Sequence, residues 1–256
     1  MKNHSIHSCA VASFAVALFC IPAASHATAT QAQLTLVPAG LVAGDTYRLV
    51  FVTADIYTAT DPKIADYNAE VTAEADSVSA LLALGTTWSV IGSTSAVNAI
   101  DNIGQDAAVP IYNLESNLIA NDATTNTGGL FSTTGDLSVS LFNPIQYTET
   151  GGFLGSANVF TGTAFNGTAN INYPGRVLGG ASIGGTSVFG GNTADDNANW
   201  IYATSIPTSS EDSLYAISGV ITVAPAVVPE PSTWAALLSG IGMLGCMQFV
   251  RRTRRA

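Results

Sequence analysis

Apolar side chains recur at three- and four-residue steps in one stretch of the chain. The series consists of Ile64, Tyr67, Val71, Ala75, Val78 and Leu82. Asp61 and Pro62 precede it as N-cap and first-turn proline, and Gly85 follows it as a terminator. This spacing predicts one amphipathic helix with its apolar face on a core. The acidic positions between the apolar ones are expected to face solvent: Glu70, Glu74 and Asp76.

Most of the remaining chain alternates short apolar segments with turn-rich stretches, a pattern typical of β-strands. The expected strands are 34–37, 47–52, 87–91, 109–112, 158–161, 200–203 and 214–223. Residues 151–191 are dense in glycine, but Phe, Val, Ile and Tyr are interspersed throughout. That mixture favours long irregular loops over disorder. The pattern predicts an α+β, mainly β fold, with one clear helix and long glycine-rich loops in a single domain.

The beginning of the chain has the pattern of an export signal. Lys2 precedes an apolar run of 13 residues, 9–21. This run is well short of the roughly 20 residues that a membrane-spanning helix needs. Small residues stand at the two positions that signal peptidase inspects, Ser25 and Ala27. We therefore expect cleavage after Ala27 rather than a retained membrane anchor.

The end of the sequence forms a second unit of three parts. The first is the motif Val228, Pro229, Glu230, Pro231 and Ser232; the second is the uncharged segment 234–250; the third is Arg251, Arg252, Arg254 and Arg255. As a helix, the uncharged segment would span about 26 Å, enough for the hydrocarbon core of a bilayer. Arginines directly after such a helix belong on the cytoplasmic side. The preceding polypeptide is therefore expected outside the membrane.

These three parts, in this order, resemble the PEP-CTERM sorting signal of Gram-negative bacteria. The resemblance implies that Pro229, Glu230 and Pro231 form a motif recognised by exosortase, a membrane enzyme. It also implies that the helix and its arginines are removed or exchanged after a transient stay in the inner membrane. The destination would be the cell surface or the exopolysaccharide matrix of a biofilm. An ordinary tail anchor would explain the helix and arginines but not the Pro-Glu-Pro.

With a signal peptide at 1–27 and a sorting signal at 227–256, residues 28–226 remain as one extracellular domain. All three histidines lie in the signal peptide, and all three cysteines lie in the two end units. The domain therefore has no disulfide, no Cys-His pair, no Ser-His-Asp triad and no zinc site built from thiolate or imidazole.

Basic residues are nearly absent from the exported part. Between 28 and 228 only Arg48, Lys63 and Arg176 oppose 17 acidic residues, a formal charge of −14. Nucleic acid is therefore excluded as a partner. The acidic surface fits either solubility outside the cell or calcium recruitment. Arg48 and Arg176 can either pair with nearby acids or hold an anionic ligand.

The order of short motifs across about 45–223 resembles the disulfide-free bacterial branch of the C-type-lectin-like family. The motifs include Phe51-Val52-Thr53 before the helix, Asn199-Trp200-Ile201 late in the chain and Leu214-Tyr215-Ala216 near its end. The resemblance implies a late tryptophan strand and a closing Leu-Tyr strand that frame a variable loop region. The cysteines and the Glu-Pro-Asn sugar triplet of true lectins are missing, so it does not imply sugar binding by their route.

Oxygen-bearing side chains gather just before Trp200, at Asp195, Asp196, Asn197 and Asn199. Such ligands suit calcium, which would be an optional ion, because the composition requires no cofactor. Trp200 would then offer its ring to a sugar. The alternative is a solvated turn that leads into a strand, with Trp200 in the core.

These features predict a non-enzymatic surface or matrix protein that works in adhesion or exopolysaccharide association. One alternative is a secreted glycosidase, since that chemistry needs only two carboxylates. Its loop glutamates would be drawn from Glu115, Glu149 and Glu211. Another alternative is a purely structural matrix protein without a ligand.

Overall fold

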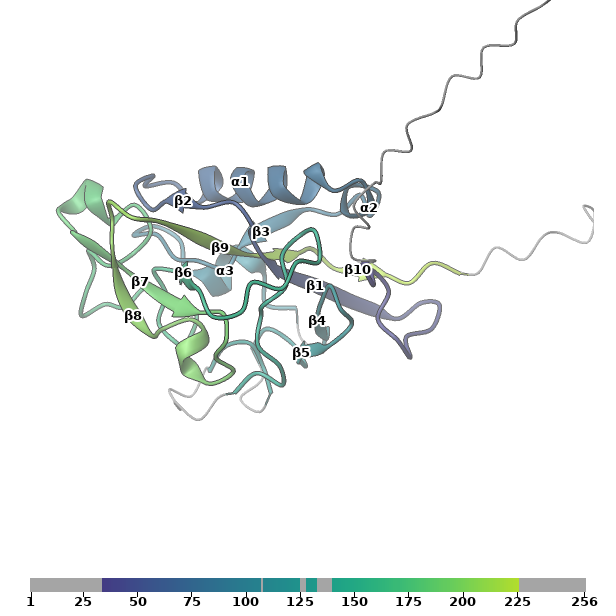
Figure 1. Cartoon of the computed structure of the whole chain (residues 1–256). Helices are drawn as coiled ribbons and strands as arrows, with labels where there is room; N and C mark the ends of the chain where they lie inside the picture. The colour runs from purple at the N-terminus through teal and green to yellow at the C-terminus, as the bar shows by residue number, and fades with distance from the viewer. Residues whose placement is uncertain (1–33, 107, 125–127, 133–139, 226–256) are drawn as a thin grey trace, which may run out of the picture. The chain divides into compact units, whose positions relative to one another are not determined.

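The computed structural model describes residues 34–106, 108–124, 128–132 and 140–225 (Figure 1). The cleavage site expected after Ala27 and the helix expected at 234–250 lie outside these ranges. Within the described ranges, no helix has the length and apolar character required to cross a bilayer.

Short strands dominate the described chain, and its helices are few. The elements in chain order are β1 (Thr46–Val52), β2 (Tyr57–Thr58), α1 (Ile64–Ser77), α2 (Ser79–Leu82), β3 (Trp88–Val90), α3 (Ala99–Ile103), β4 (Ile111–Asn113), β5 (Leu118–Ala120), β6 (Asn158–Phe160), the 3₁₀ helix η1 (Gly180–Ile183), β7 (Ser187–Asn192), the 3₁₀ helix η2 (Ala198–Trp200), β8 (Thr204–Pro207), β9 (Glu211–Ser218) and β10 (Ile221–Thr222). This composition confirms the α+β, mainly β prediction.

The strands form one mixed sheet with the order β5-β4-β1-β9-β6-β7-β8. β10 also pairs with β1, and β2 and β3 pair with β9. The β1–β4 and β6–β9 pairs are parallel, and the other pairs are antiparallel. Val50 lies opposite Ile217 and Val52 lies opposite Tyr215, so an early strand and a late strand meet at the sheet centre. The chain between them supplies the helices and the loops.

Successive residues of the central strands point to opposite faces of the sheet, and both faces are buried. On one face Leu49 and Phe51 join a core that includes Tyr67 and Val71 of α1, and Figure 1 shows α1 along that side. On the other face Val50 and Val52 join a second core. Each face therefore carries its own hydrophobic cluster.

The predicted helix is present, but its ends and its polar face differ from the prediction. The N-cap is Lys63, without a side-chain cap, rather than Asp61. Val78 adopts an extended conformation that separates α1 from α2. Leu82 is 54% exposed, so the apolar stripe ends before it. The single run from Asp61 to Gly85 was therefore wrong at both ends.

The acidic positions of α1 differ among themselves. Asp76 is exposed, as expected, whereas Glu70 is only partly exposed. Glu74 is 9% exposed, because the loop that carries β2 covers it and Tyr57 donates a hydrogen bond to it. The solvent-facing prediction was therefore wrong for Glu74.

Most predicted strands are present with shifts of up to three residues, and 214–223 is divided between β9 and β10. Residues 34–37 form no strand, although the Thr35 N–H donates to the Leu114 carbonyl at 2.9 Å. Residues 200–203 are no strand either: they end η2 and continue into a turn. The late tryptophan strand implied by the lectin-like resemblance is thus a 3₁₀ turn, whereas the closing Leu-Tyr strand is β9.

Candidate functional site

The glycine-rich stretch after residue 170 folds into a tightly packed double loop. A β-carbon at Gly180 would lie 2.1 Å from the Gly175 carbonyl oxygen, and one at Gly185 would lie 2.0 Å from the same atom. Real β-carbons do not approach a backbone oxygen so closely, so only glycine fits at these positions. The backbone contact fixes the segment that begins at Tyr173.

Arg176 lies among aromatic rings on this segment. Its Cζ lies 5.0 Å from the ring centre of Tyr173 and 5.4 Å from that of Phe189. The ring of Phe189 lies 4.6 Å from that of Tyr202, and Arg176 Nη1 donates to Ser205 Oγ at 2.8 Å. We call Tyr173, Arg176, Phe189 and Tyr202 the arginine platform. Cation–π contacts of this kind hold a guanidinium over the rings without neutralising its charge.

The arginine platform borders a pocket of about 250 Å³. The pocket is lined by Arg176, Phe189, Tyr202, Ala203, Thr204 and Ser205. Phe189 is buried, whereas Tyr173, which contacts Arg176 but is not part of this lining, is 47% exposed. No carboxylate belongs to this lining, although the exported part of the chain is strongly acidic.

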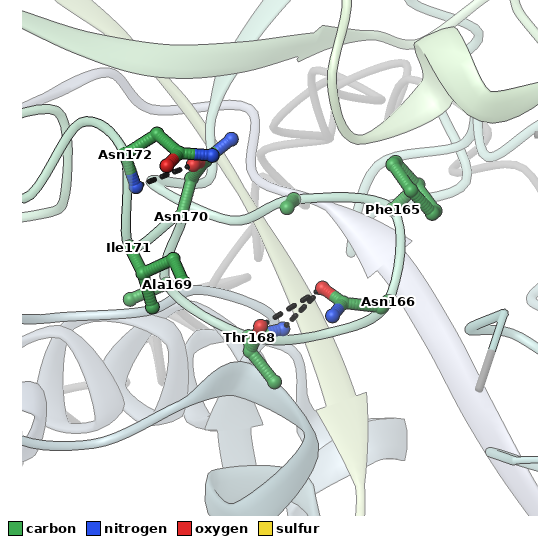
Figure 2. A pocket seen from close by; sticks show the side chains of 8 residues that line it. Phe165, Asn166, Thr168, Ala169, Asn170, Ile171 and Asn172 are labelled. Carbon is green, nitrogen blue, oxygen red and sulfur yellow. Dashed lines mark hydrogen bonds between the residues drawn. The ribbon is translucent and has the colours of Figure 1, made fainter. Parts of the chain in front are cut away.

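A second pocket, of about 300 Å³, lies within the loop that leads to Tyr173 (Figure 2). We call residues 164–172 the asparagine loop. Asn166 Oδ1 accepts from the Thr168 hydroxyl at 2.9 Å, and Asn170 Oδ1 accepts from the Asn172 N–H at 3.0 Å. Figure 2 shows these two bonds at separate points of the loop. Each bond uses an amide oxygen, so the side-chain NH₂ donors remain available to a ligand.

The asparagine loop is anchored to the domain at several points. The Ile100 N–H of α3 donates to the Gly167 carbonyl at 3.0 Å, and the Ala169 N–H donates to Asn98 Oδ1 at 3.0 Å. The Tyr173 N–H donates to the Asn170 carbonyl at 3.0 Å, which joins the loop to the arginine platform. A fixed surface that combines amide groups with a partly exposed ring has the polar and apolar character of a small-ligand site.

A separate group of carboxyls surrounds the loop that carries β2. Glu149 is 3% exposed, and its Oε2 accepts from the Ala54 N–H at 2.9 Å. Glu74 Oε1 accepts from the Tyr57 hydroxyl at 2.5 Å. Burial raises the pKa of Glu149, and the nearby charges of Glu74 and Asp55 raise it further. This group lines neither of the two pockets.

Glu70 of α1 belongs to a neighbouring acidic group. Burial raises the pKa of Glu70 to about 7, and the charges of Asp61 and Asp66 add to the effect. Burial also raises the pKa of the neighbouring Tyr67, and the charges of Asp61 and Glu70 add to the effect. Glu70 is therefore partly protonated near neutral pH.

The predicted calcium residues lie together at the start of η2. Asn197 Oδ1 already accepts from the Asn199 N–H at 2.9 Å and caps η2. Asp195 is partly exposed and Asp196 is exposed. Among the described residues, no three His, Cys, Asp or Glu side chains are grouped as metal ligands. Calcium binding here stays a prediction.

Trp200 was expected to offer its ring to a sugar, and the structure corrects this. It is 2% exposed, and its ring lies 6.1 Å from Phe131 and 5.6 Å from Tyr215. A ring covered by core neighbours cannot stack on a ligand, so Trp200 is a core residue, as the alternative interpretation held.

The three loop glutamates are placed in different surroundings. Glu115 follows β4 and donates its N–H to Asn113 Oδ1 at 3.0 Å, Glu149 is buried, and Glu211 is exposed at the start of β9. Among the described residues, no hydrogen bond joins any two of them. The glycosidase assignment stays a hypothesis.

The two arginines of the domain differ in their ion pairing. Arg48 is 2% exposed, and its Nη1 lies 3.6 Å from Asp106 Oδ2. Its Nε donates to the Ser218 carbonyl at 2.7 Å, so its role is structural. Arg176 forms no ion pair with any described residue.

Sequence reasoning missed Tyr173, Tyr202 and the asparagine loop as site residues. Its one available signal was a group of three asparagines within seven residues, Asn166, Asn170 and Asn172, directly before a tyrosine. Arg176 contacts Phe189 and Ser205, which lie 13 and 29 positions later in the chain, and no local sequence pattern predicts these contacts.

Comparison with known protein families assigns the end of the chain. The family described as PEP-CTERM protein-sorting motif matches residues 227–255. The motif indicates an exported protein that exosortase sorts, with exosortase as its processing partner and transit through the membrane toward the cell surface. No family match supports the C-type-lectin-like assignment of the central domain. No curated protein matches the chain.

Proposed function

We propose that the exported domain is a non-enzymatic module that associates with exopolysaccharide at the cell surface or in the matrix. The observation that carries this proposal is the surface of two segments that follow each other in the chain, the asparagine loop and the arginine platform, each beside a pocket. Sugar rings present apolar faces to aromatic side chains and hydroxyls to amides, and this surface offers both groups. Sorting by exosortase would deliver the module to the place where such a polymer is found.

The C-type-lectin-like assignment is part of the proposal. It is supported by the pairing of β1 with β9, which closes the domain around an excursion of helices and loops. It is also supported by the position of both pockets in the part of the chain between β6 and β9. These features fit a variable loop region that carries ligand contacts.

One experiment separates the proposed function from its two alternatives. The exported protein, purified from the producing bacterium, is incubated with that organism's own polysaccharide. Retention of protein on the intact polymer is expected. Shortening of the polymer chains would instead identify a glycosidase, and neither effect would identify a purely structural protein.

Tyr173→Ala is expected to weaken retention about 5- to 30-fold, because a partly exposed stacking ring contributes about 1–2 kcal/mol. Folding should be unaffected, since 47% of this side chain is exposed. The matched control is Phe153→Ala, which removes a ring that is 64% exposed and belongs to neither the asparagine loop nor the arginine platform. Equal losses from both variants would contradict the assignment of the surface.

Calcium is expected to bind weakly at Asp195 and Asp196 and to raise the melting temperature only at millimolar concentration. At about 100 times the dissociation constant, binding to the folded state alone would stabilise it by about 2.7 kcal/mol. Thermal melts with magnesium at matched ionic strength control for screening of the acidic surface. A shift that magnesium reproduces, or one that persists after Asp195→Ala and Asp196→Ala, would leave the loop as an ordinary turn.

A further inference from the structure

Arg176 is unusual for its setting in a strongly acidic domain. Seventeen acidic residues oppose three basic ones between 28 and 228, so a cation there has many carboxylates with which to pair. Arg48 does pair, with Asp106 at 3.6 Å. Arg176 has no carboxylate partner among the described residues and directs one nitrogen to a neutral hydroxyl, Ser205 Oγ, at 2.8 Å.

The surroundings of Arg176 hold the guanidinium in place without neutralising it. Tyr173 and Phe189 contact it through their rings, and Ser205 accepts a single hydrogen bond. Arginine carries five N–H donors in a planar fork, so most of its donors remain for a ligand. The same fork matches the two oxygens of a carboxylate.

The pocket beside Arg176 is suited to that kind of group. It encloses about 250 Å³, and none of its lining side chains is acidic. Tyr202 and Phe189 add apolar surface to the same lining, and Thr204 and Ser205 add hydroxyls. Charges farther away act weakly at physiological salt, where screening operates over about 8 Å. The domain's overall negative charge therefore does not prevent a local contact with an anion.

We propose that this pocket recognises an oxyanion carried on a sugar ring, either a carboxylate or a sulfate. Arg176 would bind this group. The polymer bound by the domain is then an acidic polysaccharide, and the charge on its rings determines specificity. This inference rests on the proposed function and names its ligand class.

The test uses the exported protein and three glycan probes: oligogalacturonate, its neutral methyl ester and a sulfated dextran. Affinities are measured by calorimetric titration at low and high salt. The native protein is expected to bind oligogalacturonate about tenfold or more tightly than the ester. Arg176→Gln should remove this preference and leave the weak binding of the ester unchanged. Binding of the sulfated probe with the same Arg176 dependence would assign the site to oxyanions in general, and its absence would assign it to carboxylates.

Two variants control for charge and for structure. Lys63→Gln removes an exposed cation at the start of α1, outside both pockets, and it should leave the preference intact. Arg176→Lys keeps the charge but loses the fork, so it should restore only part of the preference. Melting temperatures of all variants check that they fold.

Three outcomes would overturn the inference. The native protein could bind oligogalacturonate and its ester with equal affinity, Arg176→Gln could weaken the binding of both probes equally, or Lys63→Gln could reduce the preference as much as Arg176→Gln does. If the host polysaccharide were still retained in any of these cases, the proposed function would stand while the inference failed. Failure of the native protein to bind any probe or the host polymer would overturn the proposed function itself.

Discussion

Changing Pro229 and Glu230 together to alanine is expected to leave unprocessed protein in the inner membrane. Both residues belong to the sorting motif matched at 227–255, just before the uncharged segment 234–250. Without the recognised motif, exosortase should not act, and the apolar segment with its arginines should keep the chain in the membrane. Membrane fractionation with immunoblotting against the extracellular domain measures both the location and the length of the protein.

A nearby proline provides the matched control for this experiment. Pro225 lies four positions before Pro229 and outside the matched motif, so Pro225→Ala should mature normally. An ordinary tail anchor would give the same membrane-bound product with or without the motif. Normal maturation of the double variant would therefore show that the Pro-Glu-Pro assignment is wrong.

The sequence predicted those parts of the fold that depend on local periodicity. The α1 stripe of Tyr67, Val71 and Ala75 is buried as expected, because these positions share one helix face. The segment 47–52 became β1 for a similar reason: it combines apolar content with β-branched and aromatic residues. For these two segments the local pattern was sufficient.

Features that depend on distant partners could not be predicted in this way. Trp200 has the neighbours of a strand residue in sequence, yet its ring packs between Phe131 and Tyr215 from a 3₁₀ turn. Glu74 has the position of a solvated helix residue, yet Tyr57 approaches from a separate loop and donates a hydrogen bond to it. In both cases a tertiary contact overrode the local preference.

The two functional regions differ in the same respect. The sorting motif is contiguous, so residue order alone identified it, and the family comparison confirmed it. The arginine platform brings Tyr173 and Arg176 together with Phe189 and Tyr202. The glycine-rich loop that carries it is held by close backbone contacts, which no pattern of side chains predicts. A site assembled from several loops becomes visible only when the loops are placed.

The pH dependence of stability follows from the carboxyls buried around α1. Folding raises the pKa of Glu70 to about 7 from 4.5, through burial first and then the charges of Asp61 and Asp66. The pKa values of Glu74 and Glu149 are raised as well, chiefly by burial. The folded state therefore holds more protons than the unfolded chain between these limits, and stability falls as pH rises through them. The stability that protonated Glu70 contributes is fully present below about pH 4.5 and is lost above about pH 7.

Glu70→Gln is therefore expected to stabilise the protein at pH 8 by about 1–2 kcal/mol, after allowance for solvent screening of a partly exposed group. In thermal melts of the exported protein, the melting temperature should rise by about 2–4 °C per kcal/mol of added stability. At pH 5 this stabilisation should nearly vanish. The carboxyl of Glu70 in the folded protein is then mostly protonated, so it is neutral like the glutamine that replaces it. Asp76→Asn is the matched control: it removes the same charge from an exposed position of α1. If Asp76→Asn stabilised the protein as much at pH 8, relief of general repulsion would account for the effect, and the burial of Glu70 would not.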